Sequence, residues 1–198
     1  MRKYLTVAAA LVAFTAAGCG GGDDTAGSHE SMSATATATS ESASAEHNDQ
    51  DVAFAQGMIP HHQQAVDMAK AAAEKATNPA VKALAGRVQG AQDPEIQRLT
   101  EMLESWGAPT EPSGMPGMDH GSGGDGMMTD DQMAELDQAS GAEFDQMWLQ
   151  MMIEHHQGAV TMAKTELESG SDADAKALAQ QIVDAQEAEI TEMQGMLA

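Results

Sequence analysis

Two pairs of adjacent histidines, each flanked by methionines, are the side chains in this sequence with the clearest capacity for chemistry. The two sets are Met58, His61, His62 and Met68, and Met152, His155, His156 and Met162. On an α-helix, which turns by about 100° per residue, the members of each set share one face. Imidazole nitrogen and thioether sulfur together suit copper, with Cu(I) bound by Met and His and Cu(II) by His. The spacing therefore predicts metal ligands on two helices.

A structural role is the competing interpretation of these side chains. A histidine on an apolar helix face is commonly a hydrogen-bonded core residue, and methionines at helical spacing usually pack in a core. Two observations favour ligation instead. Adjacent histidines on an inner face bring two polar groups that each need a partner, and both copies of a sequence repeat keep the histidine pair and its methionines.

Two glutamates at equivalent positions of the repeat, Glu95 and Glu189, are expected on the inner faces of the following helices. A carboxylate there could bind the metal, or accept a hydrogen bond from a histidine N–H and so orient the ring, as metal sites commonly require. It could equally reach solvent at the edge of a bundle. We assign both glutamates a supporting role as hydrogen-bond acceptors.

A segment rich in glycine and proline lies between the two sets and carries further methionines. Its candidate accessory metal ligands are Met115, Met118, His120, Met127 and Met128. Because no long helix is expected there, these methionines have no evident core to pack in, and flexible Met-x-x-Met spacing can wrap a soft monovalent ion. A low-complexity linker without a binding role is the alternative.

The elements that must position these residues belong to a duplicated unit. Residues 51–70 align without a gap with residues 145–164, at an offset of 94 positions. Apolar residues recur at helical spacing in both copies, and residues that break or cap helices interrupt them. The pattern predicts long helices over residues 51–76, 80–105, 142–169 and 173–197, and a short one over 130–138 with Thr129 as its N-cap.

We predict an all-α fold, a ferritin-like four-helix bundle built from two helical hairpins at residues 50–106 and 131–198. The linker at residues 107–130 can run the length of a helix, so the second and third long helices need not be antiparallel neighbours. Pro60 lacks an N–H and is expected to kink or begin the first helix, which would leave the first site more open than the second.

The N-terminal region indicates export. Residues 1–18 carry Arg2 and Lys3 before a short apolar run, and they end in small residues directly before the single cysteine, Cys19. This arrangement resembles a bacterial lipoprotein signal peptide with Cys19 as the lipidated first residue, whereas ordinary cleavage would leave a free thiol. Residues 19–49 have the composition of a disordered tether. We expect a lipoprotein anchored to the outer face of the cell membrane.

Composition excludes several classes of protein. The 198-residue chain has 9 Lys and Arg against 31 Asp and Glu and a formal net charge of −22, so it lacks the basic face that a nucleic-acid partner requires. One cysteine rules out a disulfide framework and cysteine-based zinc sites. No repeated nucleophile accompanies the histidines, so an enzyme is not expected.

The motif Met58-Ile59-x-His61-His62-x-x-Ala65-x-x-Met68-Ala69 and its copy at residues 152–163 resemble a family of secreted bacterial proteins, domain of unknown function 305 (DUF305). The resemblance covers residues 50–198. It implies a ferritin-like helical bundle that binds copper or silver outside the cytoplasm. It also implies a part in metal tolerance, through sequestration or delivery of the ion.

Two other classes of function stay open. A ferritin-like bundle can house a di-iron oxidase, but that site requires about four inward glutamates and two Glu-x-x-His motifs, and the sequence contains no Glu-x-x-His. Alternatively, the methionine-rich faces could bind a helix of a partner protein or a second copy of the chain. Stoichiometric, histidine-dependent copper uptake would separate metal binding from partner binding.

Overall fold

The computed structural model describes residues 46–110 and 124–198, and every regular element within them is helical. The helices are α1 (Asp49–Lys75), α2 (Pro79–Trp106), α3 (Asp130–Gln138), α4 (Gly141–Ser169) and α5 (Ala173–Leu197), with a 3-10 turn, η1 (Gly124–Gly126), ahead of α3. The all-α prediction is confirmed, and the predicted helix ends lie within two residues of the observed ones. Cys19, the expected signal peptide and nearly all of the expected tether lie outside the described residues.

Local capping explains where the helices begin. Asn48 caps α1 and forms a capping box with Asp51, and Thr129 does the same for α3. Asn78 caps α2, whose first residue is Pro79, a position at which the missing N–H costs nothing. Each cap satisfies N–H groups that the first helical turn cannot pair, typically a contribution of about 1 kcal/mol. The Thr129 cap agrees with the start predicted for the short helix from the sequence.

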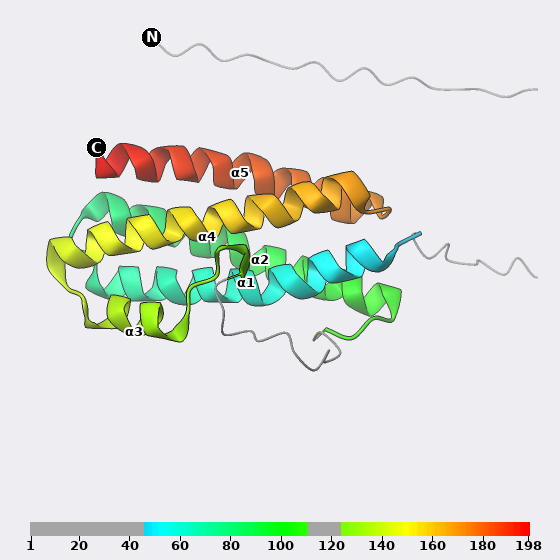
Figure 1. The fold of residues 1–198 in the computed structure, drawn as a ribbon, viewed down its shortest axis with the longest axis horizontal. Helices are drawn as coiled ribbons and strands as arrows, with labels where there is room; N and C mark the ends of the chain where they lie inside the picture. The colour runs from blue at the N-terminus through cyan, green and yellow to red at the C-terminus, as the bar shows by residue number, and fades with distance from the viewer. Residues whose placement is uncertain (1–45, 111–123) are drawn as a thin grey trace, which may run out of the picture. The chain divides into compact units, whose positions relative to one another are not determined.

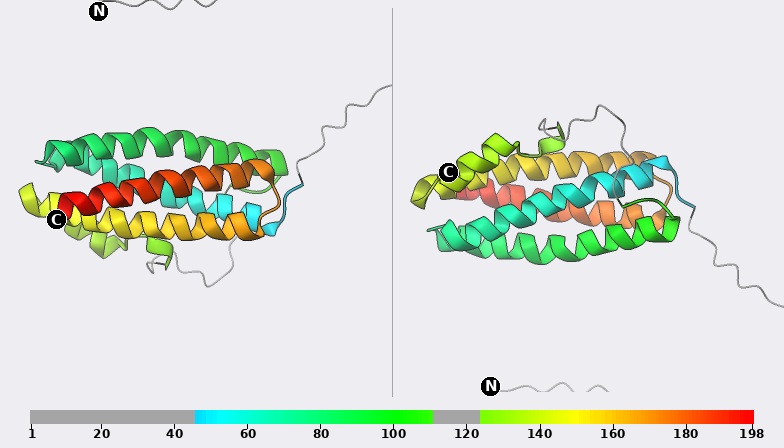
Figure 2. Two further views of the ribbon diagram at one scale, coloured as in Figure 1. Left: turned by 90° about the horizontal axis from the view of Figure 1, so that it is seen from above. Right: turned by 90° about the horizontal axis from the view of Figure 1, so that it is seen from below.

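The four long helices form a bundle of two hairpins, α1 with α2 and α4 with α5 (Figure 1). Helix α1 packs against α4, and α2 lies beside α5 (Figure 2). Helix α2 ends at the same end of the bundle where α1 begins, whereas α4 starts at the opposite end, so α1 and α4 run antiparallel (Figure 1). The chain therefore crosses the length of the bundle between α2 and α4, as in ferritin-like folds. No helix in the described part of the chain is both long and apolar enough to span a membrane.

Helix α1 passes through Pro60 without interruption. The expectation that the helix begins at this residue is wrong, and so is the expectation of a more open first site, because His61 and His62 are as buried as His155 and His156. Packing of α1 against α2 and α4 offsets the single hydrogen bond that proline removes. Helix α2 likewise contains Pro94 without a break.

The apolar core consists of two clusters that meet at mid-length of the bundle. One cluster includes the buried apolar residues of α1 up to Ile59 and those of α4 from Ala159 onward. The other takes α1 residues from Ala65 onward and α4 residues up to Met152. The histidine pairs fall between these limits on both helices, so the polar groups lie at the boundary between two apolar regions.

Two aspartates at equivalent positions of the repeat tie the hairpins together. Asp51 in α1 accepts hydrogen bonds of 3.0 Å from the backbone N–H groups of Ser171 and Asp172, in the turn between α4 and α5. Asp145 in α4 accepts bonds of 3.0 and 2.9 Å from the N–H groups of Thr77 and Asn78, in the turn between α1 and α2. Each carboxylate therefore secures the turn of the other hairpin.

Beside Asp51 lies a second buried acid, Glu166, whose position in the first repeat is not acidic. Glu166 in α4 is fully buried beside Asp51, and its equivalent in the first repeat is Ala72. Burial, with a hydrogen bond to Asp51, raises the pKa of Glu166 to about 8. Burial also acts to raise the pKa of Asp51, but hydrogen bonds from Glu166 and the backbone outweigh it and lower that pKa. Near neutral pH, Glu166 is therefore protonated and Asp51 ionised.

Because Glu166 has a raised pKa, we expect the free energy of unfolding to depend on pH. Folded protein keeps a proton on Glu166 that the unfolded chain loses above the ordinary pKa of 4.5, so stability falls as pH rises from 4.5 through about 8. We expect Glu166→Gln, which retains a donor for Asp51, to remove this part of the pH dependence. Urea unfolding at pH 5, 7 and 9, followed by circular dichroism, measures it. Parallel pH profiles for the variant and the wild type would show that Glu166 is ionised in the folded state.

Candidate metal centre

The four histidines of the two motifs meet at the centre of the bundle. His61 and His62 lie halfway along α1, His155 and His156 lie halfway along α4, and no more than 1% of any of them is exposed. The ring centroids of His61 and His155 are 3.8 Å apart across the helix interface. Each ring lies 6.4 Å from that of its neighbour in sequence. The result is one row of four imidazole rings.

Antiparallel packing of α1 and α4 also regroups the methionines. Met58 belongs to the same apolar cluster as Met162, which packs at its edge. Met68 and Met152 belong to the other cluster. The sequence predicts one site in each repeat unit, but the structure places one methionine from each unit on either side of a shared histidine row. This grouping of the methionines depends on how the two units pack together, so it cannot be predicted from the spacing within one unit.

Glu95 in α2 and Glu189 in α5 each contact a histidine of their own hairpin. The distance from His62 Nε2 to Glu95 Oε2 is 2.8 Å, and that from His156 Nε2 to Glu189 Oε2 is 2.7 Å. Both carboxylates are mostly buried, with 19% and 18% of their side chains exposed. One turn away, the buried Gln92 and Gln186 keep side-chain oxygens without hydrogen-bond partners.

These contacts determine which ring nitrogen of a neutral imidazole has a lone pair free to bind a metal ion. A carboxylate only accepts hydrogen bonds, so a neutral imidazole at His62 or His156 that keeps this contact carries its proton on Nε2 and its lone pair on Nδ1. His61 Nε2 lies 3.0 Å from the carbonyl oxygen of Asp125, which also only accepts, so the same tautomer holds. All four Nδ1 atoms are buried without a partner, and so is Nε2 of His155.

Burial keeps the central pair of rings uncharged. It lowers the pKa of His61 to about 3, and the nearby His62 and His156 add to the shift by charge repulsion. Burial also lowers the pKa of His155 well below its usual range, with repulsion from His61 as the next cause. Both rings therefore stay neutral at physiological pH, and neutral imidazole is the form that binds metal ions. In the described part of the chain, no three His, Cys, Asp or Glu side chains are grouped to hold one ion by themselves.

The accessory ligands of the linker divide between described and undescribed residues. Met115, Met118 and His120 lie outside the described residues. Met127 is partly buried, and Met128 is 6% exposed and packs in the same apolar cluster as Met152. The expectation that linker methionines lack a core to pack in is therefore wrong for Met128, because the end of the linker folds onto the bundle.

Asp125, near the end of the linker, contacts the histidine row, and neither it nor Gln64 was among the site residues predicted from the sequence. Asp125 reaches His61 through its carbonyl oxygen, and Gln64 pairs with the backbone of Met128. A signal was present in the repeat, because Gln64 and Gly158 occupy equivalent positions within two motifs that otherwise match closely. Their difference marks a place where the two units meet different neighbours.

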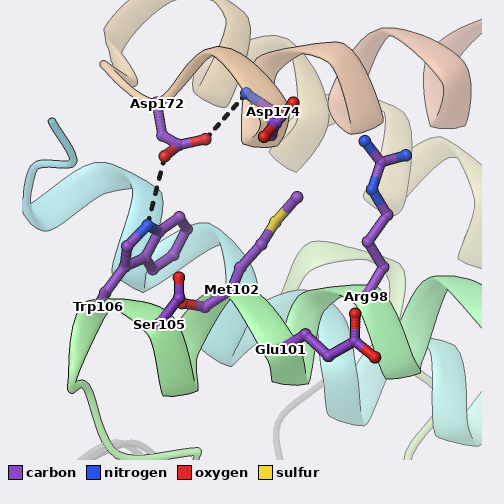
Figure 3. Close-up of a pocket in the computed structure, with 7 residues that line it drawn as sticks. All are labelled: Arg98, Glu101, Met102, Ser105, Trp106, Asp172 and Asp174. Carbon is purple, nitrogen blue, oxygen red and sulfur yellow. Dashed lines mark hydrogen bonds between the residues drawn. The ribbon is translucent and has the colours of Figure 1, made fainter. Parts of the chain in front are cut away.

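A shallow hollow at one end of the bundle contains none of the predicted ligands (Figure 3). Met102 and Trp106 from α2 line it together with Arg98, and Asp172 at the start of α5 accepts a 3.3 Å hydrogen bond from the Trp106 indole. His47 stacks on the same indole with ring centroids 5.2 Å apart. The candidate site is therefore the histidine row inside the bundle, not this surface hollow.

The fold and the site together define a class of protein: an all-α bundle of two duplicated hairpins whose centre holds buried histidines between methionines. Residues 51–197 match the family described as domain of unknown function (DUF305), and the chain belongs to that family.

Solved structures of related proteins have the same fold. A DUF305 protein from Streptomyces coelicolor is 34% identical with a TM-score of 0.69, over 75% of this chain and 91% of that one. A DUF305 fragment from Deinococcus radiodurans is 33% identical with a TM-score of 0.67, over 76% and 96%. CopM in its Cu(II)-bound form is 34% identical with a TM-score of 0.65, over 74% and 95%. A comparison with curated protein sequences finds no match.

Proposed function

We propose that this protein binds copper, and also silver, through the histidines and methionines at the centre of its bundle. The proposed ligands are Met58, His61, His62, Met68, Met152, His155, His156 and Met162. Glu95 and Glu189 would orient two of the rings through their hydrogen bonds. The metal ion is cargo in this proposal, and no catalytic step is assigned.

The observation that carries the proposal is the group of ring nitrogens that are buried without partners. Five of them lie together in the row of four rings. An unpaired buried polar group costs about 1–3 kcal/mol, and native proteins seldom leave one unexplained. Metal ligation would use these lone pairs. The neutral state of the central rings favours binding, because no proton has to be displaced from the ligating atom.

The methionines on either side of the row support a soft metal ion. Thioether sulfur selects Cu(I) among the common cellular metals, and the chemically similar Ag(I) would follow it, whereas imidazole also accepts Cu(II). Structures of CopM in Cu(II)-bound, Cu(I)-bound and Ag-bound forms are all similar to this chain, at 30–34% identity. Donor set and relationship therefore favour the same ions.

We further propose that the protein works outside the cytoplasm as a lipoprotein, anchored through Cys19, and that it sequesters or delivers copper and so contributes to metal tolerance. The N-terminal sequence supports export. The related Streptomyces coelicolor protein has been named as a candidate secreted protein. Ligands buried in a bundle would keep a reactive ion away from water and other molecules, which suits storage or transport.

Competition among metals tests the proposed function. We expect the full chain, exposed to copper, iron and zinc together under reducing conditions and then desalted, to retain copper in a fixed stoichiometry by mass spectrometry. Copper outcompetes other divalent ions at many nitrogen sites, so retention counts only if it is lost when all four histidines are replaced by leucine. Retention of iron instead of copper would favour the di-iron alternative and contradict the proposal.

A further inference from the structure

Residues 125–129, which we call the strap, lie against the middle of the bundle just ahead of α3 (Figure 1). Three hydrogen bonds attach the strap to α1. His61 Nε2 donates to the carbonyl oxygen of Asp125 at 3.0 Å. The side chain of Gln64 donates to the carbonyl oxygen of Met128 at 2.8 Å and accepts from its N–H at 2.7 Å. The strap therefore pairs its backbone with side chains one turn apart.

Helix α4 provides a seat for the strap by means of a glycine. A Cβ atom placed on Gly158 would lie 1.5 Å from the Asp125 carbonyl oxygen, a distance that no side chain can tolerate. Gly126 fits as closely on the other side, since its Cβ would lie 2.4 Å from the Glu154 carbonyl oxygen. Glycine at both positions allows the strap backbone to reach His61 across α4.

The two repeat units differ in sequence at the position that contacts the strap. Gln64 in α1 and Gly158 in α4 are equivalent positions, and each is suited to a different contact with the same five residues. The backbone of Asp125 adopts φ 58° and ψ 28°, a left-handed conformation that residues other than glycine rarely adopt. Contacts with both central helices hold the carbonyl of Asp125 in place in this conformation.

Three of the four histidines now have an oxygen acceptor on Nε2. Glu95 serves His62 and Glu189 serves His156 as equivalent members of the repeat. His61 has the strap carbonyl, whereas its equivalent, His155, is not reached by the strap and approaches only the backbone of His61, without a well-formed hydrogen bond. A duplicated site would leave both central rings without acceptors, so the strap adds an acceptor that the repeat does not encode.

We infer that the Asp125 carbonyl is a positioning group of the metal centre: it fixes His61 in the tautomer whose Nδ1 binds the ion, as the two glutamates do for their histidines. This inference rests on the proposed function. It makes the two halves of the centre unequal, because the strap supplies a carbonyl acceptor to His61 and none to His155. It also couples the linker to the centre, since an ion bound at His61 would hold the strap in place and the seated strap would tighten binding by the same factor.

Removing the seat of the strap tests this role. The Gly158→Ala variant places a methyl group where the Asp125 carbonyl oxygen lies, so the strap should leave. We expect faster hydrogen exchange at the Met128 N–H, loss of the Nε2–H signature of His61 in nitrogen-15 NMR spectra of the metal-free protein, and Cu(I) affinity lowered by about 10–100-fold. Gly86→Ala is the matched control, because a Cβ atom there meets nothing within 4 Å.

The outcomes separate the two proposals. If the strap leaves in Gly158→Ala but the His61 tautomer and Cu(I) affinity match those of Gly86→Ala, the positioning role is refuted. If the wild-type chain takes up no copper through its histidines, the proposed function fails, while the NMR comparison still decides whether the strap fixes His61. Should Gly158→Ala not fold, Gln64→Ala removes two strap hydrogen bonds without a clash, and it must shift the same readouts in the same direction.

Discussion

Replacing His61 and His155 together by leucine is expected to abolish histidine-dependent copper binding while leaving the metal-free bundle folded. The two rings lie 3.8 Å apart at the centre of the row, so their loss interrupts any arrangement of ligands that spans it. The fall in affinity should exceed the roughly 10–100-fold that follows from losing an outer hydrogen-bond partner. Isothermal titration with Cu(I) and Cu(II) measures the loss.

Although copper affinity should fall, the stability of the metal-free variant should not. Leucine has nearly the volume of histidine and removes three buried nitrogens that have no partner, at the cost of the single hydrogen bond to the Asp125 carbonyl. Because each unpaired group costs about 1–3 kcal/mol, the free energy of unfolding should stay level or rise. If the histidines bind metal, the variant loses copper binding and keeps its stability. If they are only structural, it keeps copper binding and loses stability.

Two controls complete this experiment. His47→Leu changes a histidine outside the bundle centre and should leave copper binding unchanged. Met115→Leu with Met118→Leu, introduced into every protein compared, removes a share of binding that the linker could contribute. If the His61→Leu, His155→Leu variant keeps its copper and loses stability, the histidines are core residues and the proposed centre does not exist.

The second large effect is expected at Asp145, whose removal should destabilise the bundle by about 2–4 kcal/mol. Asp145→Ala leaves the N–H groups of Thr77 and Asn78 without their acceptor and the Thr77 hydroxyl without its 2.6 Å bond. It also cuts a link between the two hairpins. For a chain of this size each 1 kcal/mol lowers the melting temperature by about 2–4 °C.

Thermal unfolding by circular dichroism measures this loss. Asp145→Asn keeps one acceptor oxygen and should lose less stability than the alanine variant. Asp67→Ala is the matched control, because Asp67 is exposed and its one ion pair within the described residues is with Lys70 on the same helix, so its loss should change stability by less than about 0.5 kcal/mol. Equal melting temperatures for Asp145→Ala and Asp67→Ala would show that the turn does not depend on this carboxylate.

The local features of the protein could be predicted from its residues alone. Apolar spacing near 3.6, the residues that break or cap helices, and the Thr129 N-cap predict the helices to within two residues, because helix formation and capping depend on neighbours a few positions away. The same periodicity places each histidine pair and its methionines on one helix face. The internal repeat predicts two equivalent hairpins, and their helices form the bundle.

How these helix faces combine depends on the packing of the whole bundle. Antiparallel docking of α1 and α4 brings His61 to His155 and groups Met58 with Met162, and no spacing within one unit encodes that contact. Hydrophobic attraction between helices is non-directional, so the partner of each face follows from the whole packed core.

The same reason explains which contacts could not be predicted from the sequence. Asp51 and Asp145 align in the repeat, but each acts on the turn of the other hairpin, more than 60 positions away in the chain. The Asp125 carbonyl that meets His61 is a backbone group, whose contacts leave no mark on the identity of its own side chain. Such a contact is recorded only in the neighbours that make room for it, here Gly158 in place of the glutamine at the equivalent position, and that substitution has meaning only once α1, α4 and the strap lie side by side.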